Sequence, residues 1–278
     1  MNKFLGSRKS FEESKIIITG VPFDSTSSFR AGSRFAPQYI RFFSDSIETY
    51  SPYQDFDIKD IPFFDNEDVR VSPGDTKKTL EIIYNYTTYL VSVNKFPFFI
   101  GGEHLITYPM VKAIKDDNEI IVIQFDAHTD LRDEYAGLEY SHATVMKRII
   151  ELKKVKLIQL GIRSGSREEF KLAKENNFLY NLNDIEKINK LIKNKNVYIT
   201  VDVDVFDPAY VPGVGNPEAG GIDFSQFLDF ILKLKDFNLK GIDVVELSPE
   251  IDPTHISSIF VSKLIRELLI FVYNTIKE

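Results

Sequence analysis

The chain has 278 residues, of which 43% are hydrophobic and 27% are charged. We expect a single domain over residues 1–278, because one hydrophobic core can grow to roughly 250–300 residues before chains divide. Cysteine is absent, which excludes disulfides, thiolate metal sites and a cysteine nucleophile. The net charge of −7, with no patch rich in lysine and arginine, argues against a nucleic-acid partner and favours a neutral or cationic small molecule.

The sequence gives no sign of membrane targeting. Residues 1–15 become charged too soon for the apolar region of a secretory signal. The longest apolar run, 268–273, is far shorter than the roughly 20 residues that span a bilayer. We therefore expect a cytoplasmic protein with no membrane partner.

Apolar runs alternate with segments of helical periodicity along most of the chain. The runs are apolar at nearly every position, which is typical of strands buried on both faces of a parallel sheet. In chain order we expect strand 15–21, helices 36–45 and 76–94, strand 97–100, helix 105–116, strand 119–125, helix 141–154, strand 155–161, helices 165–176 and 183–194, strand 197–203, helix 223–236, strand 241–247 and helix 257–276. This alternation predicts an α/β fold built as a three-layer α/β/α sandwich.

The segment 206–221 has neither helical nor strand periodicity and holds three prolines and four glycines. A connection of this length in a compact domain usually has a function. Because it directly follows the strand 197–203, we interpret it as a loop over the active site. The alternative is a surface loop with no role.

Histidines and carboxylates follow four of the expected strands at the point where each strand ends. Ligands of open α/β sheets bind beyond the carboxyl ends of the strands, so these side chains are candidates for one site. They are His104, Asp126, His128, Asp130, Asp202, Asp204 and Glu246.

Asp202 and Asp204 interrupt an apolar run, and side chains two apart on a strand share a face. Two carboxylates buried side by side repel each other and lose their hydration, and a divalent cation removes both costs. The alternative is a solvent-facing strand end. Asp126, His128 and Asp130 repeat this spacing after another strand, and together the two motifs favour a metal site.

The six histidines and aspartates supply two nitrogen and four carboxylate ligands and no sulfur. This set is too large for one ion with an open position and fits two bridged ions. It suits Mn²⁺ better than a structural Zn²⁺, although Co, Fe or Zn could occupy it. Two cations about 3.5–4 Å apart would lower the pKa of a shared water toward neutrality. Four aspartates balance two divalent cations, so Glu246 leaves the pocket negative and favours a cationic substrate.

Several motifs resemble those of the ureohydrolases, the arginase/agmatinase family, and are most like agmatinase. They are Gly-Gly-Glu-His at 101–104, Asp-Ala-His-Thr-Asp at 126–130, Asp-Val-Asp-Val-Phe-Asp-Pro at 202–208 and Asp-Val-Val-Glu-Leu-Ser-Pro at 243–249. Segments 20–24 and 30–37 also match, so the resemblance spans about residues 18–250 in order.

The resemblance implies an arginase-like fold with a mostly parallel sheet of about eight strands and two Mn²⁺ per subunit. It also implies hydrolysis of a small cationic guanidino substrate to urea and an amine, and a homo-oligomer, either trimer or hexamer. The family's metal ligands carry over to His104, Asp126, His128, Asp130, Asp202 and Asp204.

Three residues receive catalytic or substrate-binding roles from the resemblance. His142 corresponds to the histidine that passes a proton to the leaving amine, and it is also expected to bind the substrate. A histidine beside the helix cap Ser141 could instead be structural. Glu246 corresponds to the carboxylate that pairs with the guanidinium, with a buried structural carboxylate as the alternative. Asp130 would accept a hydrogen bond from the attacking hydroxide and aim it.

Agmatine, which would give putrescine and urea, is the expected substrate, and polyamine synthesis is the expected setting. Arginine, guanidinobutyrate, formimidoylglutamate and aminopropyl-agmatine are the alternatives, as are a one-zinc deacetylase of the same fold and a non-catalytic polyamine-binding relative. Glu103 and Asn216 stand where the family commonly has Asp and Thr. Asp133 and Glu134 could meet a distal ammonium or be solvated loop charges.

Overall fold

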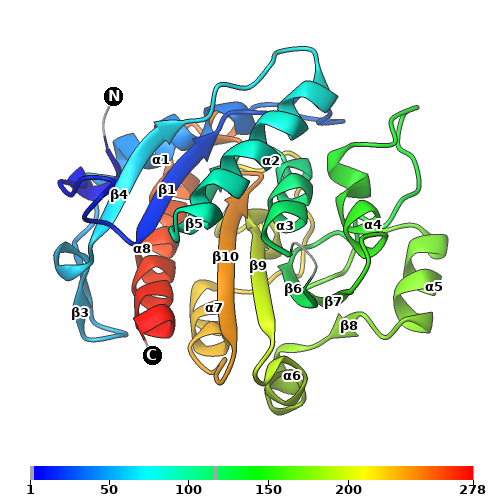
Figure 1. Cartoon of the computed structure of the whole chain (residues 1–278). Helices are drawn as coiled ribbons and strands as arrows, with labels where there is room; N and C mark the ends of the chain where they lie inside the picture. The colour runs from blue at the N-terminus through cyan, green and yellow to red at the C-terminus, as the bar shows by residue number, and fades with distance from the viewer. Residues whose placement is uncertain (1–2, 116–117, 278) are drawn as a thin grey trace.

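The computed structural model describes residues 3–115 and 118–277, so residues 1, 2, 116, 117 and 278 of the expected domain lie outside it. Its centre is an eight-stranded sheet in the order β4-β1-β5-β10-β9-β6-β7-β8, with every neighbouring pair parallel (Figure 1). In chain order its strands are β1 (Ile16–Val21), β4 (Phe63–Asp68), β5 (Phe96–Gly101), β6 (Ile120–Phe125), β7 (Val155–Leu160), β8 (Leu179–Tyr180), β9 (Asn196–Asp202) and β10 (Asn238–Val245). A separate antiparallel pair joins β2 (Tyr50–Ser51) to β3 (Phe56–Asp57).

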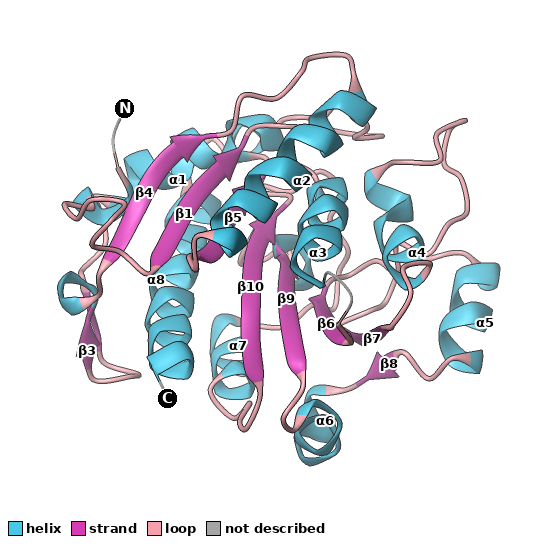
Figure 2. Ribbon diagram, viewed as in Figure 1, coloured by secondary structure: helices cyan, strands magenta, loops and turns pink. Residues whose placement is uncertain are grey.

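Helices cover both faces of the sheet (Figure 2). One core holds apolar side chains of α1 (Ala36–Ser44), α6 (Ile185–Ile192), α7 (Phe224–Ile231) and α8 (Ile256–Lys277). The other holds those of α2 (Thr76–Ser92), α3 (Thr107–Lys115), α4 (Val145–Ile150) and α5 (Arg167–Glu175). Ile16 and Ile18 of β1 enter the first core and Ile17 the second, as the two-residue period of a strand requires. The expected three-layer α/β/α sandwich is therefore confirmed.

All six expected strands and all eight expected helices overlap observed elements, although residue 116 of the expected helix 105–116 lies outside the described residues. The helix expected over 141–154 is shorter, because a 3-10 turn, His142–Thr144, precedes α4. Two strands of the sheet were not expected. β4 is an edge strand rich in polar residues, and β8 has only two residues, so neither has the apolar run of a central strand.

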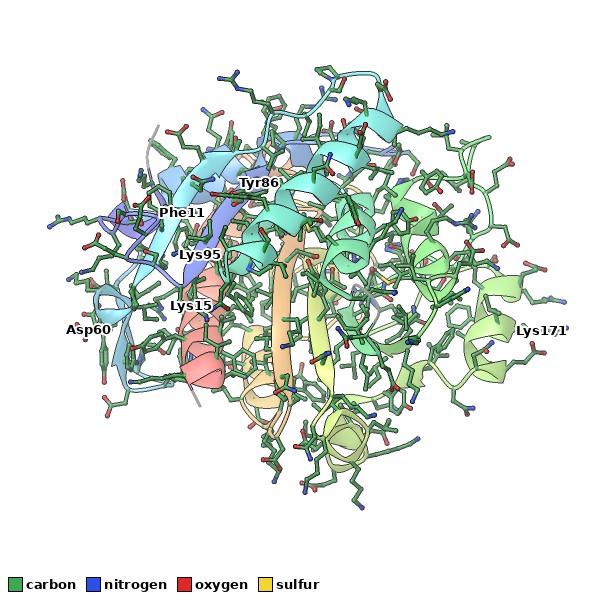
Figure 3. All side chains as sticks on the ribbon, viewed as in Figure 1. Phe11, Lys15, Asp60, Tyr86, Lys95 and Lys171 are labelled. Carbon is green, nitrogen blue, oxygen red and sulfur yellow. The ribbon has the colours of Figure 1, made fainter. Side chains whose placement is uncertain are left out.

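The segment before β1 is held against the start of β5 by one lysine. The ammonium of Lys95 donates to the carbonyl oxygens of Phe11 and Ser14, each at 2.7 Å, and lies 4.9 Å from the centre of the Phe11 ring (Figure 3). Within the described residues, no helix combines the length and the hydrophobicity needed to cross a bilayer.

A buried ion pair joins α1 to the edge strand β4. The guanidinium of Arg41 donates to both carboxylate oxygens of Asp65, each at 2.8 Å, and also contacts Asp68. Arg41 is 2% exposed and Asp65 is fully buried. The pair compensates two charges that would be costly to bury alone, so removing one partner leaves the other uncompensated.

We expect Arg41→Met to lower the free energy of unfolding by about 3–5 kcal/mol, because Asp65 would remain buried without its partner. Urea denaturation measures this loss. Lys78→Met is the control, since it breaks the exposed Lys78–Glu81 pair of similar length and should cause a much smaller loss. Equal losses in the two variants would contradict the importance of the buried pair.

Candidate dinuclear metal centre

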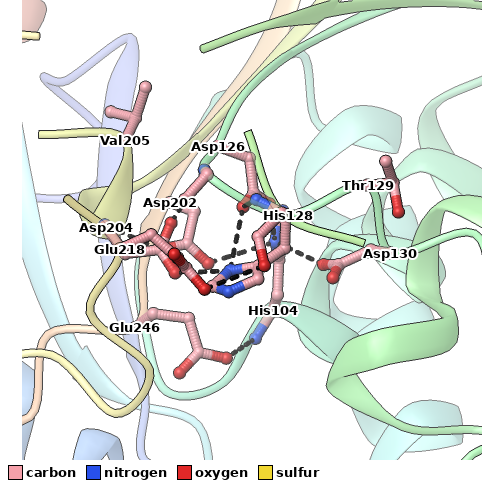
Figure 4. A network of polar contacts seen from close by, with 12 residues as sticks. His104, Asp126, His128, Thr129, Asp130, Asp202, Asp204, Val205, Glu218 and Glu246 are labelled. Atoms are coloured by element: carbon pink, nitrogen blue, oxygen red, sulfur yellow. Dashed lines mark hydrogen bonds and ion pairs between the residues drawn. The ribbon is translucent and has the colours of Figure 1, made fainter. Parts of the chain in front are cut away.

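Four neighbouring strands of the sheet, β5, β10, β9 and β6, end at one level. Val245, the last residue of β10, pairs with Asp202, the last residue of β9. Phe125, the last residue of β6, pairs with Val201. The chain beyond each end therefore enters the same space. Six side chains predicted as metal ligands lie together there: His104, Asp126, His128, Asp130, Asp202 and Asp204 (Figure 4).

The two glycines that precede Glu103 allow β5 to end in close contact with the neighbouring chain. A Cβ on Gly102 would lie 2.1 Å from the carbonyl oxygen of Phe23, and one on Gly101 would lie 2.7 Å from Ile106. Neither glycine has a positive φ. The pair is therefore required for close approach rather than for a left-handed backbone.

The first cluster surrounds the imidazole of His104. Its Nδ1 lies 3.0 Å from Asp126 Oδ2, 3.1 Å from Asp130 Oδ2 and 3.4 Å from Asp202 Oδ2. All four side chains are buried. Three carboxylates thus point at one ring nitrogen, which is the arrangement of a metal site with one nitrogen and several oxygen ligands.

The second cluster surrounds His128, whose Nδ1 lies 2.8 Å from Asp204 Oδ2 and 3.7 Å from Asp126 Oδ1. Asp126 belongs to both clusters through different carboxylate oxygens. Within each of the sets His104–Asp126–Asp202 and Asp126–His128–Asp204, the candidate ligand atoms lie within 4.8 Å of one another. Two sets with a shared carboxylate fit two neighbouring cations.

Thr200 on β9 fixes the orientation of the His104 ring through its Nε2. The Thr200 hydroxyl donates its one proton to Asp243 at 2.6 Å, so its oxygen accepts from His104 Nε2 at 2.9 Å. Tyr198 also donates to Asp243, at 2.7 Å. A neutral His104 with its proton on Nε2 presents the Nδ1 lone pair to three carboxylates, and this nitrogen has no hydrogen-bond partner among the described residues. A cation at that point would accept the lone pair and offset the carboxylates, so the residues fit a metal ion.

The pKa shifts of the clustered aspartates and of His104 also favour a bound cation. Burial, followed by the neighbouring Asp126, raises the pKa of Asp130 to about 7. Burial and then nearby carboxylates also raise the pKa of Asp202 and of Asp204. Burial alone would lower the pKa of His104, but the carboxylates around it raise that pKa well above its usual value. The site therefore favours added positive charge, which two divalent cations would supply.

Asp202 and Asp204 meet in a way that strand alternation did not predict. β9 ends at Asp202, and Asp204 lies in the 3-10 turn Val203–Val205. The carboxylate of Asp202 accepts the backbone N–H of Asp204 at 2.9 Å, and that of Asp204 accepts the N–H of Ala127 at 2.9 Å. The turn, rather than the pleat of the strand, brings the two carboxylates together.

A cavity of about 470 Å³ opens above these clusters. His128, Asp130, Asp202 and Asp204 line it, while His104 and Asp126 lie buried beside them. The other two predicted site residues, His142 and Glu246, line the same cavity. The loop 206–221 contributes Asn216, Pro217 and Glu218, in agreement with its interpretation as an active-site loop.

Glu246 is held in a left-handed backbone conformation with φ of 67°, and Asp130 has φ of 53°. Such conformations are costly for residues other than glycine and occur often at functional sites. The carboxylate of Glu246 accepts the backbone N–H of His104 at 2.7 Å through Oε1. Burial, and then the neighbouring Glu103, raise the pKa of Glu246 well above its usual value, so this carboxyl favours a positively charged partner.

His142 begins the 3-10 turn His142–Thr144 and is held in place by residues of the segment 24–28. Its backbone N–H donates to Thr26 Oγ1 at 3.1 Å, and its Nε2 lies 3.1 Å from Ser28 Oγ. Burial lowers the pKa of His142 to about 4, so the imidazole is neutral at pH 7. Glu103, buried below, accepts the Thr26 backbone N–H at 2.8 Å and the Thr26 hydroxyl proton. The longer side chain at position 103 thus anchors the segment that holds His142.

Asp133 and Glu134 do not line the cavity. Asp133 is 82% exposed and pairs with Lys147 at 2.8 Å, and Glu134 is exposed. Sequence reasoning instead missed Glu169 and Glu218, which do line it. Glu218 lies in a loop that the sequence had marked as functional, whereas no motif pointed to Glu169.

Residues 14–271 match the sequence profile of the arginase family. An agmatinase of Bacillus cereus is 40% identical over 275 residues, which cover 96% of this chain and 95% of that protein. A crystal structure from Clostridium difficile has a TM-score of 0.90 and 42% identity, covering 95% of this chain and 99% of that one. The agmatine ureohydrolase of Thermoplasma volcanium has a TM-score of 0.86 and 32% identity, covering 98% and 94%. The chain therefore belongs to the arginase family of metal-dependent ureohydrolases.

Proposed function

We propose that the chain hydrolyses agmatine to putrescine and urea with the help of two divalent cations, for which Mn²⁺ is our expectation. The observation that carries this proposal is the pair of histidine–aspartate clusters joined through Asp126, at the base of a cavity that also holds Glu246. The names of the Bacillus cereus and Thermoplasma volcanium relatives support agmatine as the substrate.

The two clusters suggest how the cations are shared. His104, Asp126, Asp130 and Asp202 would hold one cation, and Asp126, His128 and Asp204 would hold the other. When bound, the cations supply positive charge and lower the pKa of a coordinated water toward neutrality. Asp130 would accept a hydrogen bond from the attacking water and aim it at the guanidino carbon.

Glu246 would hold the guanidinium. Its Oε1 already accepts the His104 N–H, which fixes the carboxylate and leaves its other oxygen for a charge-assisted hydrogen bond with the substrate. The left-handed backbone at position 246 aims the side chain into the cavity from the end of β10.

His142 would carry a proton to the leaving amine. A neutral imidazole can accept a proton at one nitrogen and release it, and Ser28 beside Nε2 gives it a polar neighbour.

The trimeric or hexameric assembly, the cytoplasmic location and the role in polyamine synthesis stay predictions. Light scattering of the purified protein measures the assembly.

We expect urea from agmatine in the presence of Mn²⁺, at a kcat/KM at least about tenfold above that for arginine, because arginine would bring an additional carboxylate into a cavity already lined by carboxylates. A colorimetric urea assay on agmatine, arginine, guanidinobutyrate, formimidoylglutamate and aminopropyl-agmatine measures the preference. Failure to release urea from any guanidino compound would leave the deacetylase and the non-catalytic alternatives standing.

Asp204→Asn should reduce the bound metal from two ions per chain toward one, because asparagine supplies a neutral and weaker ligand. The amide oxygen can still accept the Ala127 N–H, so the turn is preserved. Elemental analysis after dialysis measures the stoichiometry. Asp133→Asn, a change to an exposed carboxylate outside the cavity, should keep two ions. Two ions in Asp204→Asn would count against its role as a ligand.

His142→Gln should lower kcat by about 10²-fold or more with a small change in KM, because it removes a proton carrier while leaving the guanidinium contacts intact. Steady-state urea release measures both constants. The metal content should remain at two ions, which separates this effect from damage to the metal centre. A kcat within the range of the unmodified protein would refute the assignment.

A further inference from the structure

The cavity contains two carboxylates that the proposed metal centre and guanidinium site do not use, Glu169 and Glu218. They differ in how many protein donors they already serve. Glu169 is 5% exposed and accepts from Thr129 Oγ1 at 2.7 Å, from Leu131 N at 3.1 Å and from Ser166 N at 2.8 Å. Arg132 adds an ion pair at 3.4 Å. Both oxygens of Glu169 are therefore occupied in holding the loops around it.

Glu218 has a different environment. Its Oε1 accepts one hydrogen bond, from Ser164 Oγ at 2.9 Å, and among the described residues no hydrogen bond or ion pair reaches its Oε2. The side chain is half-buried in the wall of the cavity. Ser164 orients this carboxylate and leaves its Oε2 without a protein donor, so Glu218 offers an acceptor oxygen to a cationic ligand in the cavity.

The backbone of Glu218 is fixed relative to the metal centre by a single guanidinium. Arg163 Nη2 donates to the carbonyl oxygen of Glu218 at 2.8 Å and to that of Asp204 at 2.7 Å. Its Nη1 also donates to the carbonyl oxygens of Val205 and Gly161. The turn carrying the candidate metal ligand Asp204 and the loop carrying Glu218 are therefore held side by side, which preorganises the wall of the cavity beside the metal centre.

We propose that Glu218 is the specificity-determining residue that binds the ammonium at the far end of the substrate from the guanidinium. This inference rests on the proposed function. Glu246 and Glu218 give the cavity one carboxylate for each positive end of a linear dication. Phe29 and Tyr135 also line the cavity and offer apolar surface to the chain of methylene groups between those ends. A substrate that ends in a carboxylate would instead be repelled by Glu218.

The test compares agmatine with n-butylguanidine, which has the guanidinium and the four-carbon chain but no ammonium. In Glu218→Gln, kcat/KM for agmatine should fall about 10- to 30-fold, mainly through KM, because a charge-assisted hydrogen bond to the ammonium is lost. For n-butylguanidine it should change by no more than about twofold, since this substrate never makes that contact. Its retained turnover also shows that the variant is folded.

Glu134→Gln is the matched control, since it removes the same charge from an exposed position outside the cavity. It should leave the preference for agmatine over n-butylguanidine unchanged. This result would show that the effect of Glu218→Gln comes from contact with the ammonium and not from the change in net charge of the protein. The inference is overturned if Glu218→Gln keeps the full preference, or if it slows both substrates equally through damage to the loop. If the unmodified protein releases urea from neither compound, the proposed function fails and this inference fails with it.

Discussion

The mutual repulsion of Asp126, Asp130, Asp202 and Asp204 is the constraint on which the rest of the structure depends. All four are buried at one sheet edge, where burial and neighbouring carboxylates raise the pKa of Asp130, Asp202 and Asp204. Among the described residues, His104 and His128 are the only basic side chains within ion-pair distance of these carboxylates. Apolar packing cannot relieve such a cluster, whereas two divalent cations relieve both the repulsion and the loss of hydration. A cluster of buried carboxylates would destabilise a purely structural core, and the same cluster allows this site to bind metal.

The fold serves this cluster by making its supports rigid. Asp243 gathers the hydroxyl protons of Thr200 and Tyr198, and Thr200 in turn fixes the Nε2 proton of His104. Because Nε2 donates to Thr200, Nδ1 is the nitrogen that faces the carboxylates and could bind a cation. On the other side of the centre, Arg163 ties the turn that carries Asp204 to the loop 206–221 through backbone carbonyls. Neither support lines the cavity, yet both fix the positions of residues in the metal centre.

The sequence was sufficient for the parts of the structure that follow from periodicity and from the chemistry of strand ends. The central strands are apolar because both of their faces are covered, and His104, Asp126 and Asp202 stand out because charged or polar residues end those runs. β4 and β8 escaped prediction because edge strands are short or polar. The sequence offered Asp133 and Glu134, and not Glu218, as candidates to meet a distal cation. The structure distinguishes these residues through contacts distant in sequence. Asp133 pairs with Lys147 on the surface, whereas Arg163 holds the loop 206–221 so that Glu218 lines the cavity.

Carboxylates in one cavity can be assigned to structure or to ligand binding by the donors that the protein already gives them. Glu169 accepts from a hydroxyl and two backbone N–H groups and also pairs with Arg132, so both of its oxygens are already bound by groups of the protein. Glu246 accepts one backbone N–H and Glu218 one hydroxyl, so each is oriented but keeps an oxygen for another cation. A single fixed donor lowers the freedom of a carboxylate without cancelling its charge, which is the condition for binding a cationic group tightly and in one orientation. On this basis the cavity is built for a molecule with positive charge at both ends, and the metal centre decides at which end it is cut.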